Sequence, residues 1–286
     1  MRLGLYDDRP VLITGHRSDT VTVVDVAEAS GDRFGPDPMH LWEVWDDFRA
    51  WGRDRAAWAD RAKGRPVERG ELGPPVPRPR QIFAIGTNYR SHAAEIGLPA
   101  VPSVFTKFAT CLTGPDTTVA LPSDTVDWEV ELVAVIGRRA EGVPRERAWE
   151  HVAGLMVGQD LSERTGQFAA DPAQFSLAKS HPGFGPTGPW LTTLDELTNP
   201  ADLAIVCRRG EQELQSGHTG QMIFDVPELI AHLSAVTPLL PGDLIFTGTP
   251  SGVGHGRTPR QYLRPGDRLI STIEELGHLH QQFTAT

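Results

Sequence analysis

One stretch, residues 127–137, constrains the fold more than any other: Asp-Trp-Glu-Val-Glu-Leu-Val-Ala-Val-Ile-Gly. Its β-branched and apolar residues predict a strand that is buried on both faces. Because side chains alternate along a strand, Glu129 and Glu131 should point the same way, side by side. Two like charges in a buried place need a compensating cation, or one of them must take up a proton. A bound divalent metal is the simplest solution, and it indicates an enzyme.

A third carboxylate strengthens this reading. Asp160 ends the apolar run of residues 153–160, at the point where a second predicted strand leaves the core. Three carboxylates with no cysteine or paired histidine nearby favour a hard cation, so Mg²⁺ or Mn²⁺ fits better than Zn²⁺, and Ca²⁺ stays open. The alternative is a solvated strand end that carries exposed acids without any ion.

The composition limits the classes of partner. The chain has 286 residues, a formal net charge of −10 and no run of Lys or Arg, which argues against nucleic acid and anionic membranes. No apolar stretch approaches the ~20 residues that a membrane helix needs. The N-terminus lacks a signal-peptide core, so we expect a cytoplasmic protein. Cys111 and Cys207 predict neither a disulfide framework nor a thiolate metal site.

A proline-rich segment, residues 64–80, divides the chain. We therefore expect a small N-terminal α+β domain over residues 1–75 and a catalytic domain over residues 76–286. In the first part, residues 11–13 and 21–24 are typical of strands. Residues 38–61 predict one helix, whose apolar stripe should pack in the core. The stripe consists of Leu41, Trp45, Phe48 and Trp51.

The second part shows many short strands and few long helices. The predicted strands are residues 81–85, 132–136, 154–158, 203–208, 243–247 and 268–273, and the predicted helices are 90–96, 145–150 and 226–236. Strands without regular helical crossovers favour an α+β, mostly β domain over a doubly wound sheet.

Several further side chains are candidates for the chemistry. Arg164 and Gln167 follow Asp160 at spacings of four and seven, which places them on one helical face. Both are donors suited to a substrate carboxylate or an oxyanion, although a surface turn is an equal alternative. Lys179 can hold charge on a bound anion or organise water at a metal, although a lone lysine is usually a solvated cation.

A histidine and a loop complete the candidates. His92 and Glu95, three residues apart on a predicted helix, could form a general-base pair, although exposed pairs of this kind are commonly without a role. The loop of residues 248–254, Gly-Thr-Pro-Ser-Gly-Val-Gly, lacks the spacing of a phosphate or dinucleotide loop. Its glycines allow close approach of the backbone to a ligand.

Read in order, these segments resemble the fumarylacetoacetate hydrolase family from about Arg80 to the C-terminus. The matching motifs are Asn88-Tyr89 with His92 and Glu95, Glu129 with Glu131, Asp160 with Arg164 and Gln167, Lys179-Ser180 before a Gly188-Pro189-Trp190 turn, and the loop of residues 248–254. Chance would not supply all five in this order. One departure is Thr165, where many relatives carry Asp, which could change how Arg164 is oriented.

The resemblance implies a rolled mixed β-sheet and, usually, a homodimer. It implies that the three acids bind Mg²⁺ or Mn²⁺, and that the family's substrates are 2-oxo acids and 1,3-dicarbonyl compounds. The implied catalytic residues are His92, Glu95, Lys179, Arg164 and Gln167, and the implied substrate-binding residues are Tyr89, Gly248 and Thr249.

The expected function is metal-dependent hydrolysis of a C–C bond in an acylpyruvate or a related 1,3-dicarbonyl compound or 2-oxo acid. The same motifs are shared by decarboxylases, hydratases and tautomerases of 2-oxo diacids such as oxaloacetate, which stay open as alternatives. A family member that binds a metabolite without turnover is a third possibility. The intact acids, His92 and Lys179 argue against it, since a binding module needs no general base.

Overall fold

A large mixed sheet organises the computed structural model, which describes residues 1–17, 19–59, 61–90 and 100–286. The sheet has 12 strands, and its main path runs β4-β3-β2-β1-β14-β12-β11-β17-β6-β7. The strands are β1 (Arg2–Tyr6), β2 (Arg9–Arg17), β3 (Thr20–Asp25), β4 (Arg65–Glu68), β5 (Leu72–Gly73), β6 (Ile82–Ile85), β7 (Val104–Thr106), β8 (Leu112–Thr113), β11 (Val130–Ile136), β12 (Val152–Gln159), β14 (Gly185–Thr192) and β17 (Leu244–Phe246).

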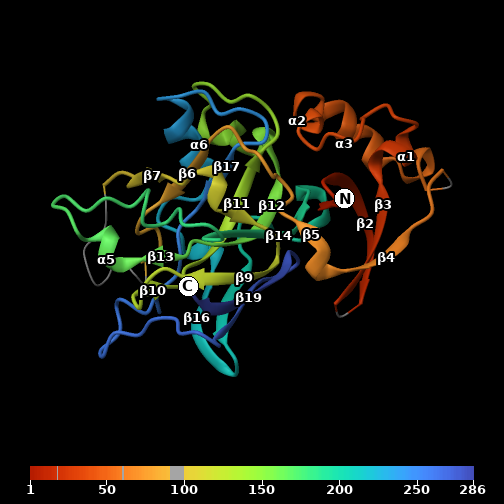
Figure 1. Cartoon of the computed structure of the whole chain (residues 1–286). Coiled ribbons are helices and arrows are strands. Elements are labelled where there is room, and N and C mark those ends of the chain that lie inside the picture. The colour runs from red at the N-terminus through yellow and green to blue at the C-terminus, as the bar shows by residue number, and fades with distance from the viewer. Residues whose placement is uncertain (18, 60, 91–99) are drawn as a thin grey trace.

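Two smaller sheets lie against it (Figure 1). A five-stranded sheet runs in the order β16-β15-β18-β19-β9, and β10 pairs with β13. Their bounds are β9 (Asp116–Leu121), β10 (Val126–Asp127), β13 (Ser162–Glu163), β15 (Ala204–Arg209), β16 (Gln212–His218), β18 (Arg268–Ile273) and β19 (Gly277–Ala285). Most pairs are antiparallel, whereas β14–β8, β17–β6 and β19–β9 are parallel. The prediction of a mostly β, α+β fold is confirmed.

Helices are short and few in the described part of the chain. The α-helices are α1 (Val26–Ser30), α2 (His40–Glu43), α3 (Trp45–Arg53), α5 (Arg164–Gln167) and α6 (Val226–Ser234), and η4 (Arg145–His151) is a 3-10 helix. None of them is long and apolar enough to cross a membrane. The helix predicted over residues 90–96 falls mostly outside the described residues.

The predicted strands all overlap observed strands, but two local predictions are wrong. Residues 38–61 do not form one helix, because the backbone of Val44 leaves the helical region at φ −120° and separates α2 from α3. The predicted apolar stripe is nevertheless buried. Gly188-Pro189-Trp190 is not a turn, since it lies within β14, where the pairing with β12 is irregular.

The N-terminal strands continue the large sheet. Strand β1 pairs with β14, so β1–β4 extend the sheet at one end, and α2 and α3 lie on that side, to the right in Figure 1. Phe48 and Trp45 of α3 belong to one apolar cluster with Val133 and Val135 of β11. The division into domains at residues 75 and 76 stays a prediction.

Strand β11 positions the candidate site. All seven of its residues are buried, as the apolar run predicted. Its alternate side chains enter two different apolar clusters, with Leu132 and Ala134 in one and Val133 and Val135 in the other. This packing on both faces fixes the strand tightly, so the acidic residues at its start are held in place by the core.

Candidate functional site

Three carboxylates converge where β11 begins and β12 ends. Glu131 lies in β11, Glu129 precedes it, and Asp160 directly follows β12. The amide of Asp160 donates to the carbonyl of Glu129 at 2.9 Å, which joins the two strands at this point. One carboxylate oxygen from each residue lies within 4.8 Å of the others. The structure therefore brings together the three residues that the sequence suggested as metal ligands.

Lys179 lies against two of these acids. Its Nζ is 2.7 Å from Glu129 Oε2, from Asp160 Oδ2 and from the hydroxyl of Ser162. Burial alone would lower the pKa of Lys179, but the charges of Asp160 and Glu129 outweigh burial and raise it. The predicted candidate is thus a buried, permanently charged ammonium, not a solvated surface lysine.

A second buried lysine was not predicted. Lys107 places its Nζ 2.7 Å from Asp160 Oδ1 and also donates to the carbonyls of Lys179 and Phe184. Neither side chain of the Lys107–Asp160 pair is exposed to solvent. Lys107 stands alone in its segment, without a motif, so no local pattern in the sequence could have identified it.

Arg164 begins α5 and is held by acids on both sides. Its Nε and Nη2 lie 2.9 and 2.7 Å from Asp127 Oδ2, and Nη2 lies 2.6 Å from Glu129 Oε1. Its Nη1 donates to Gln167 Oε1 at 2.8 Å, so the predicted pair is in direct contact. Thr165 instead places its hydroxyl 2.8 Å from that of Thr125. The orientation of Arg164 is therefore set by Asp127.

Asp127 is the other residue that sequence reasoning missed. It is fully buried and accepts from the backbone amides of Gly254 and His255 at 2.7 and 2.9 Å. The sequence did contain a signal for it, because the alternation that places Glu129 and Glu131 on one face of a strand also places residue 127 on that face. Asp127 links the predicted glycine loop to Arg164 and, through it, to Glu129.

The ion pairs form one buried cluster with an uneven balance of charge. Among the described residues it contains four carboxylates and three cations, namely Asp127, Glu129, Glu131, Asp160, Lys107, Arg164 and Lys179. One negative charge is therefore in excess. It rests on Glu131, whose pKa is raised well above its usual value by burial and by the charges of Asp160 and Glu129.

Glu129 behaves in the opposite way. Burial opposes its ionisation, but the charges of Lys179 and Arg164 outweigh burial and lower the pKa of Glu129 to about 2. The two neighbouring glutamates thus differ because one is surrounded by cations and the other is not. The difference between the two pKa values also follows from the like charges of the two carboxylates, which disfavour ionisation of both at once.

The site fits a divalent cation. Glu131 Oε2 accepts from the amide of Gly248 at 2.8 Å, while no donor among the described residues reaches the buried Glu131 Oε1. A buried carboxylate oxygen without a partner is unfavourable unless a cation meets it. The donor set is oxygen only, as Mg²⁺ and Mn²⁺ prefer, and the added charge would offset the excess on Glu131.

A cavity of about 340 Å³ opens beside Glu129. Five of the predicted or metal-site residues line it, namely Glu129, Arg164, Gln167, Lys179 and Thr249. The rest of its wall is largely apolar, with Ile85, Phe105, Phe168, Phe175 and Val253. A cleft of this size with a few convergent polar groups is typical of a small-molecule site.

The remaining predicted residues differ in their placement. Gly248 donates its backbone amide to Glu131, so it positions the Glu131 carboxylate. Tyr89 is fully buried, its hydroxyl has no partner among the described residues, and its pKa is raised by burial and by Glu131. His92 and Glu95 lie outside the described residues, so their role as a general base stays a prediction.

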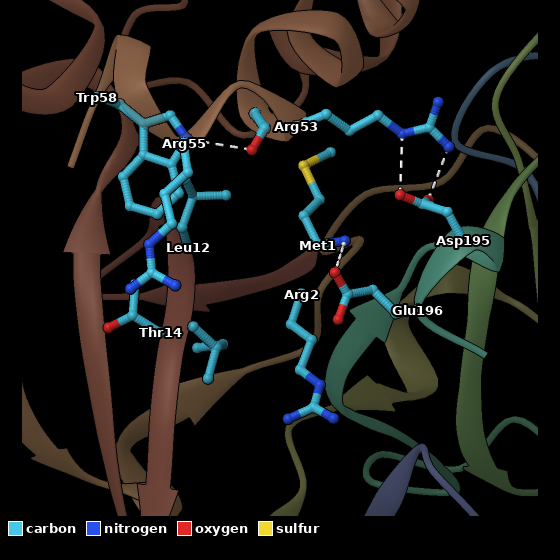
Figure 2. A pocket seen from close by; sticks show the side chains of 11 residues that line it. Met1, Arg2, Leu12, Thr14, Arg53, Arg55, Trp58, Asp195 and Glu196 are labelled. Carbon is cyan, nitrogen blue, oxygen red and sulfur yellow. Dashed lines mark hydrogen bonds and ion pairs between the residues drawn. The ribbon is translucent and has the colours of Figure 1, made fainter. Parts of the chain in front are cut away.

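A larger cavity, of about 600 Å³, lies elsewhere, between the N-terminal strands and residues 194–196 (Figure 2). Its acids are already neutralised, because Asp195 pairs with Arg53 at 2.8 Å and Glu196 with the Met1 amine at 2.9 Å. Both buried cysteines are free. None of the residues that line this larger cavity lines the cavity beside Glu129.

Fold and site together define a class: a mostly β protein with a candidate cation site of oxygen ligands beside a largely apolar cleft. The model of the fumarylacetoacetate (FAA) hydrolase C-terminal family matches residues 81–284. The chain belongs to the fumarylacetoacetate hydrolase family, as the resemblance of its motifs indicated.

Curated relatives carry several activities in their names. The bovine mitochondrial oxaloacetate tautomerase FAHD2A is 42% identical over 207 residues, which are 71% of this chain. The match spans 66% of that relative's length. The 2,4-didehydro-3-deoxy-L-rhamnonate hydrolase of Sphingomonas sp. (strain SKA58) is also 42% identical, over 76% of this chain and 78% of the relative.

Solved structures agree in fold. A Mycobacterium smegmatis protein with the provisional name HpcE is 50% identical, with full coverage of both chains and a TM-score of 0.90. The maleylpyruvate hydrolase of Sphingobium sp. SYK-6, solved with a manganese(II) ion and pyruvate, is 28% identical with a TM-score of 0.81. That match covers 100% of this chain and 99% of the maleylpyruvate hydrolase chain.

Proposed function

We propose that the protein is a divalent-cation-dependent hydrolase that cleaves a C–C bond of an acylpyruvate or a related 2-oxo acid. The observation that carries the proposal is the convergence of Glu129, Glu131 and Asp160, with one carboxylate oxygen of each within 4.8 Å of the others, beside a substrate-sized cavity that Glu129 lines. One buried oxygen of Glu131 has no partner among the described residues. The name of the manganese-bound maleylpyruvate hydrolase supports both the metal and the reaction.

The carboxylates would hold Mg²⁺ or Mn²⁺, which polarises substrate oxygens when bound and so stabilises negative charge on a leaving enolate. Around it, Lys179 and Arg164 supply fixed positive charge beside the substrate's carboxylate and carbonyl oxygens. Asp127 keeps the guanidinium of Arg164 in one orientation, so this charge needs little reorganisation during the reaction.

Gln167 lies beside Arg164 on the cavity wall and accepts its Nη1–H through Oε1. This contact leaves the amide of Gln167 oriented with its NH₂ group as a donor for a substrate oxygen. We assign the proton transfer to His92, oriented by Glu95, which would take a proton from the attacking water. The substrate carbonyl remote from the carboxylate would then receive the hydroxide, the C–C bond would break, and the proton taken by His92 would return to the carbon of the leaving enolate.

The test is turnover of acetopyruvate by purified protein with Mn²⁺ or Mg²⁺, followed by identification of the products. We expect pyruvate and acetate, and loss of turnover in Glu129→Gln and after treatment with a chelator. A matched control is Glu211→Gln, at an exposed position that does not line the cavity, and this variant should retain turnover. Full activity of metal-free Glu129→Gln protein would contradict the proposal.

A second candidate is the tautomerisation or decarboxylation of oxaloacetate. It is favoured by the names of several relatives at about 40% identity, which are oxaloacetate tautomerases. In this reaction the same cation site would stabilise an enolate, but no water would be activated. Incubation with oxaloacetate, monitored for keto–enol exchange and for pyruvate, separates this function from hydrolysis.

Two further expectations belong to the whole protein. We propose a homodimer, and chromatography with light scattering should give twice the chain mass of 31.2 kDa. The cytoplasmic compartment also stays a prediction, and several relatives are named as mitochondrial proteins.

A further inference from the structure

Aromatic rings form a row from the carboxylate cluster to the mouth of the cavity. The Nζ of Lys179 lies 5.2 Å from the ring centre of Phe105. Phe105 meets Phe175 edge to face at 5.3 Å, and Phe175 meets Phe168 edge to face at 6.4 Å. The last pair, Phe168 and His255, is stacked at 4.9 Å. All four rings line the cavity above the site.

The outer end of this row is open to solvent. Phe168 is 48% exposed. Together with Phe175 and His255 it offers a surface on which an apolar group of a ligand could pack. An exposed aromatic ring beside a cleft is unfavourable in water and becomes favourable when a ligand covers it. Edge-to-face and stacked arrangements are also the geometries in which aromatic groups attract one another.

The cations of the cavity wall are already committed. Lys179 uses its three donors on Glu129, Asp160 and Ser162. Arg164 binds Asp127, Glu129 and Gln167 through all three of its nitrogens. These two are the only Lys or Arg side chains among the described residues that line the cavity.

Thr249 and His255 also line the cavity and add no charge to it. The hydroxyl of Thr249 donates to the carbonyl of Val130 and accepts from Gln215. His255 Nδ1 lies 3.1 Å from the hydroxyl of Tyr262, and burial together with Arg164 lowers the pKa of His255, so the ring is neutral at pH 7.

The overall charge of the site points the same way. The buried cluster has one negative charge in excess, so a bound divalent cation would leave it with one positive charge. A substrate with a single carboxylate neutralises that charge.

We infer that the aromatic row binds the distal acyl group of the substrate, and that this group is an uncharged ring-bearing one, as in an aroylpyruvate. Phe168 and His255 are then the residues that select it over a distal carboxylate. The inference rests on the proposed function, since it assigns the far end of the same substrate. It predicts a monocarboxylate substrate for this chain.

The test compares three ligands that differ only at the distal end: acetopyruvate, benzoylpyruvate and 4-carboxybenzoylpyruvate. With Mn²⁺, kcat/KM should be highest for benzoylpyruvate and about tenfold or more lower for its carboxylated analogue. Phe168→Ala should lower the ratio of benzoylpyruvate to acetopyruvate turnover about three- to tenfold. Leu177→Ala removes an apolar side chain that is 77% exposed and does not line the cavity, and it should leave this ratio unchanged.

Arg260 allows a test of the opposite outcome, in which a distal carboxylate is preferred. It is exposed and close enough to His255 to lower that residue's pKa, so it is the cation that a distal carboxylate would meet. Arg260→Ala should not change the order of the three ligands. If the carboxylated analogue ranked first and Arg260→Ala lowered its turnover, the inference would be overturned.

Binding separates this inference from the proposed function. Thermal shifts with Mn²⁺ and each ligand need no turnover, and benzoylpyruvate should give the largest shift. Failure to hydrolyse any of the three contradicts the hydrolase alone. Equal shifts for all three, or the largest shift with the carboxylated ligand, contradict the aromatic site whatever the activity.

Discussion

Glu131 carries the excess negative charge of the buried cluster, and this makes stability depend on pH. Its pKa in the folded protein is raised above the usual 4.5, so the folded chain holds more protons than the unfolded chain above that pH. Stability of the metal-free protein therefore falls as pH rises through this range. In a series of melting temperatures with chelator, Glu131→Gln should be the more stable protein at pH 8, with a gap that closes toward pH 4.5.

The comparison isolates one residue, because all other titrations are common to both proteins. Glu211→Gln, at an exposed position, should follow the wild-type curve. Addition of Mn²⁺ should raise the melting temperature of the wild type and have little effect on Glu131→Gln. A gap that widens as the pH falls would show that Glu131 is not the group with the raised pKa.

Replacement of Lys107 tests whether this unpredicted cation stabilises the buried cluster. Lys107→Met removes one partner of a fully buried ion pair and leaves Asp160 less well compensated. Such losses cost about 3–5 kcal/mol, so urea denaturation should show a change of that order in the free energy of unfolding. Lys63→Met, at an exposed position, should stay within about 0.5 kcal/mol of wild type, and an equally small effect at Lys107 would refute the assignment.

Between β17 and β18, the glycine loop fixes Asp127 from one side. A Cβ at Gly254 would lie 1.9 Å from the carbonyl oxygen of Gln261 and 2.8 Å from Asp127 Oδ1, so the loop must shift. Gly254→Ala should then release Asp127 and misplace Arg164. A displacement of about 1 Å can lower kcat/KM about 100-fold. Gly15→Ala, where the nearest atom is 3.7 Å away, is the control, and matching activities for the two variants would contradict this role of the loop.

Elements with a strong local pattern could be predicted, and elements that depend on distant partners could not. β11 and β12 are apolar on both faces, so their sequence identifies them directly. β14 contains Gly and Pro at several positions, which are typical of turns, and it is a strand because β12 and β1 pair with it. The break between α2 and α3 likewise has no signal in the apolar stripe, which is continuous.

The whole chain should unfold as one unit. Leu3, Leu12 and Phe48 from the N-terminal part share an apolar cluster with Val133 and Phe246 of the central strands, and β1 pairs with β14. Calorimetry should therefore show a single transition, and a fragment of residues 76–286 should be poorly soluble because β14 would lose β1 and expose an edge of the sheet. Two well-separated transitions, or a stable fragment, would instead support independent domains.

The candidate site follows the same division between local and distant information. The sequence predicted Glu129, Glu131 and Asp160, because strand periodicity and the end of a buried run are local properties. Lys107 joins Asp160 from a segment 53 residues away, and its contact depends on how the sheets pack. The aromatic row likewise combines Phe105 with His255, which no spacing in the sequence connects.

The most direct test of the account is a crystal structure of the protein grown with Mn²⁺, with anomalous diffraction used to locate the ion. We expect one strong peak in contact with oxygens of Glu129, Glu131 and Asp160, at about the 2.0–2.2 Å typical of such ligands. Glu131→Gln crystals should lack this peak. A peak held by other residues, or three carboxylates that bind no ion at saturating Mn²⁺, would contradict the metal site and the function built on it.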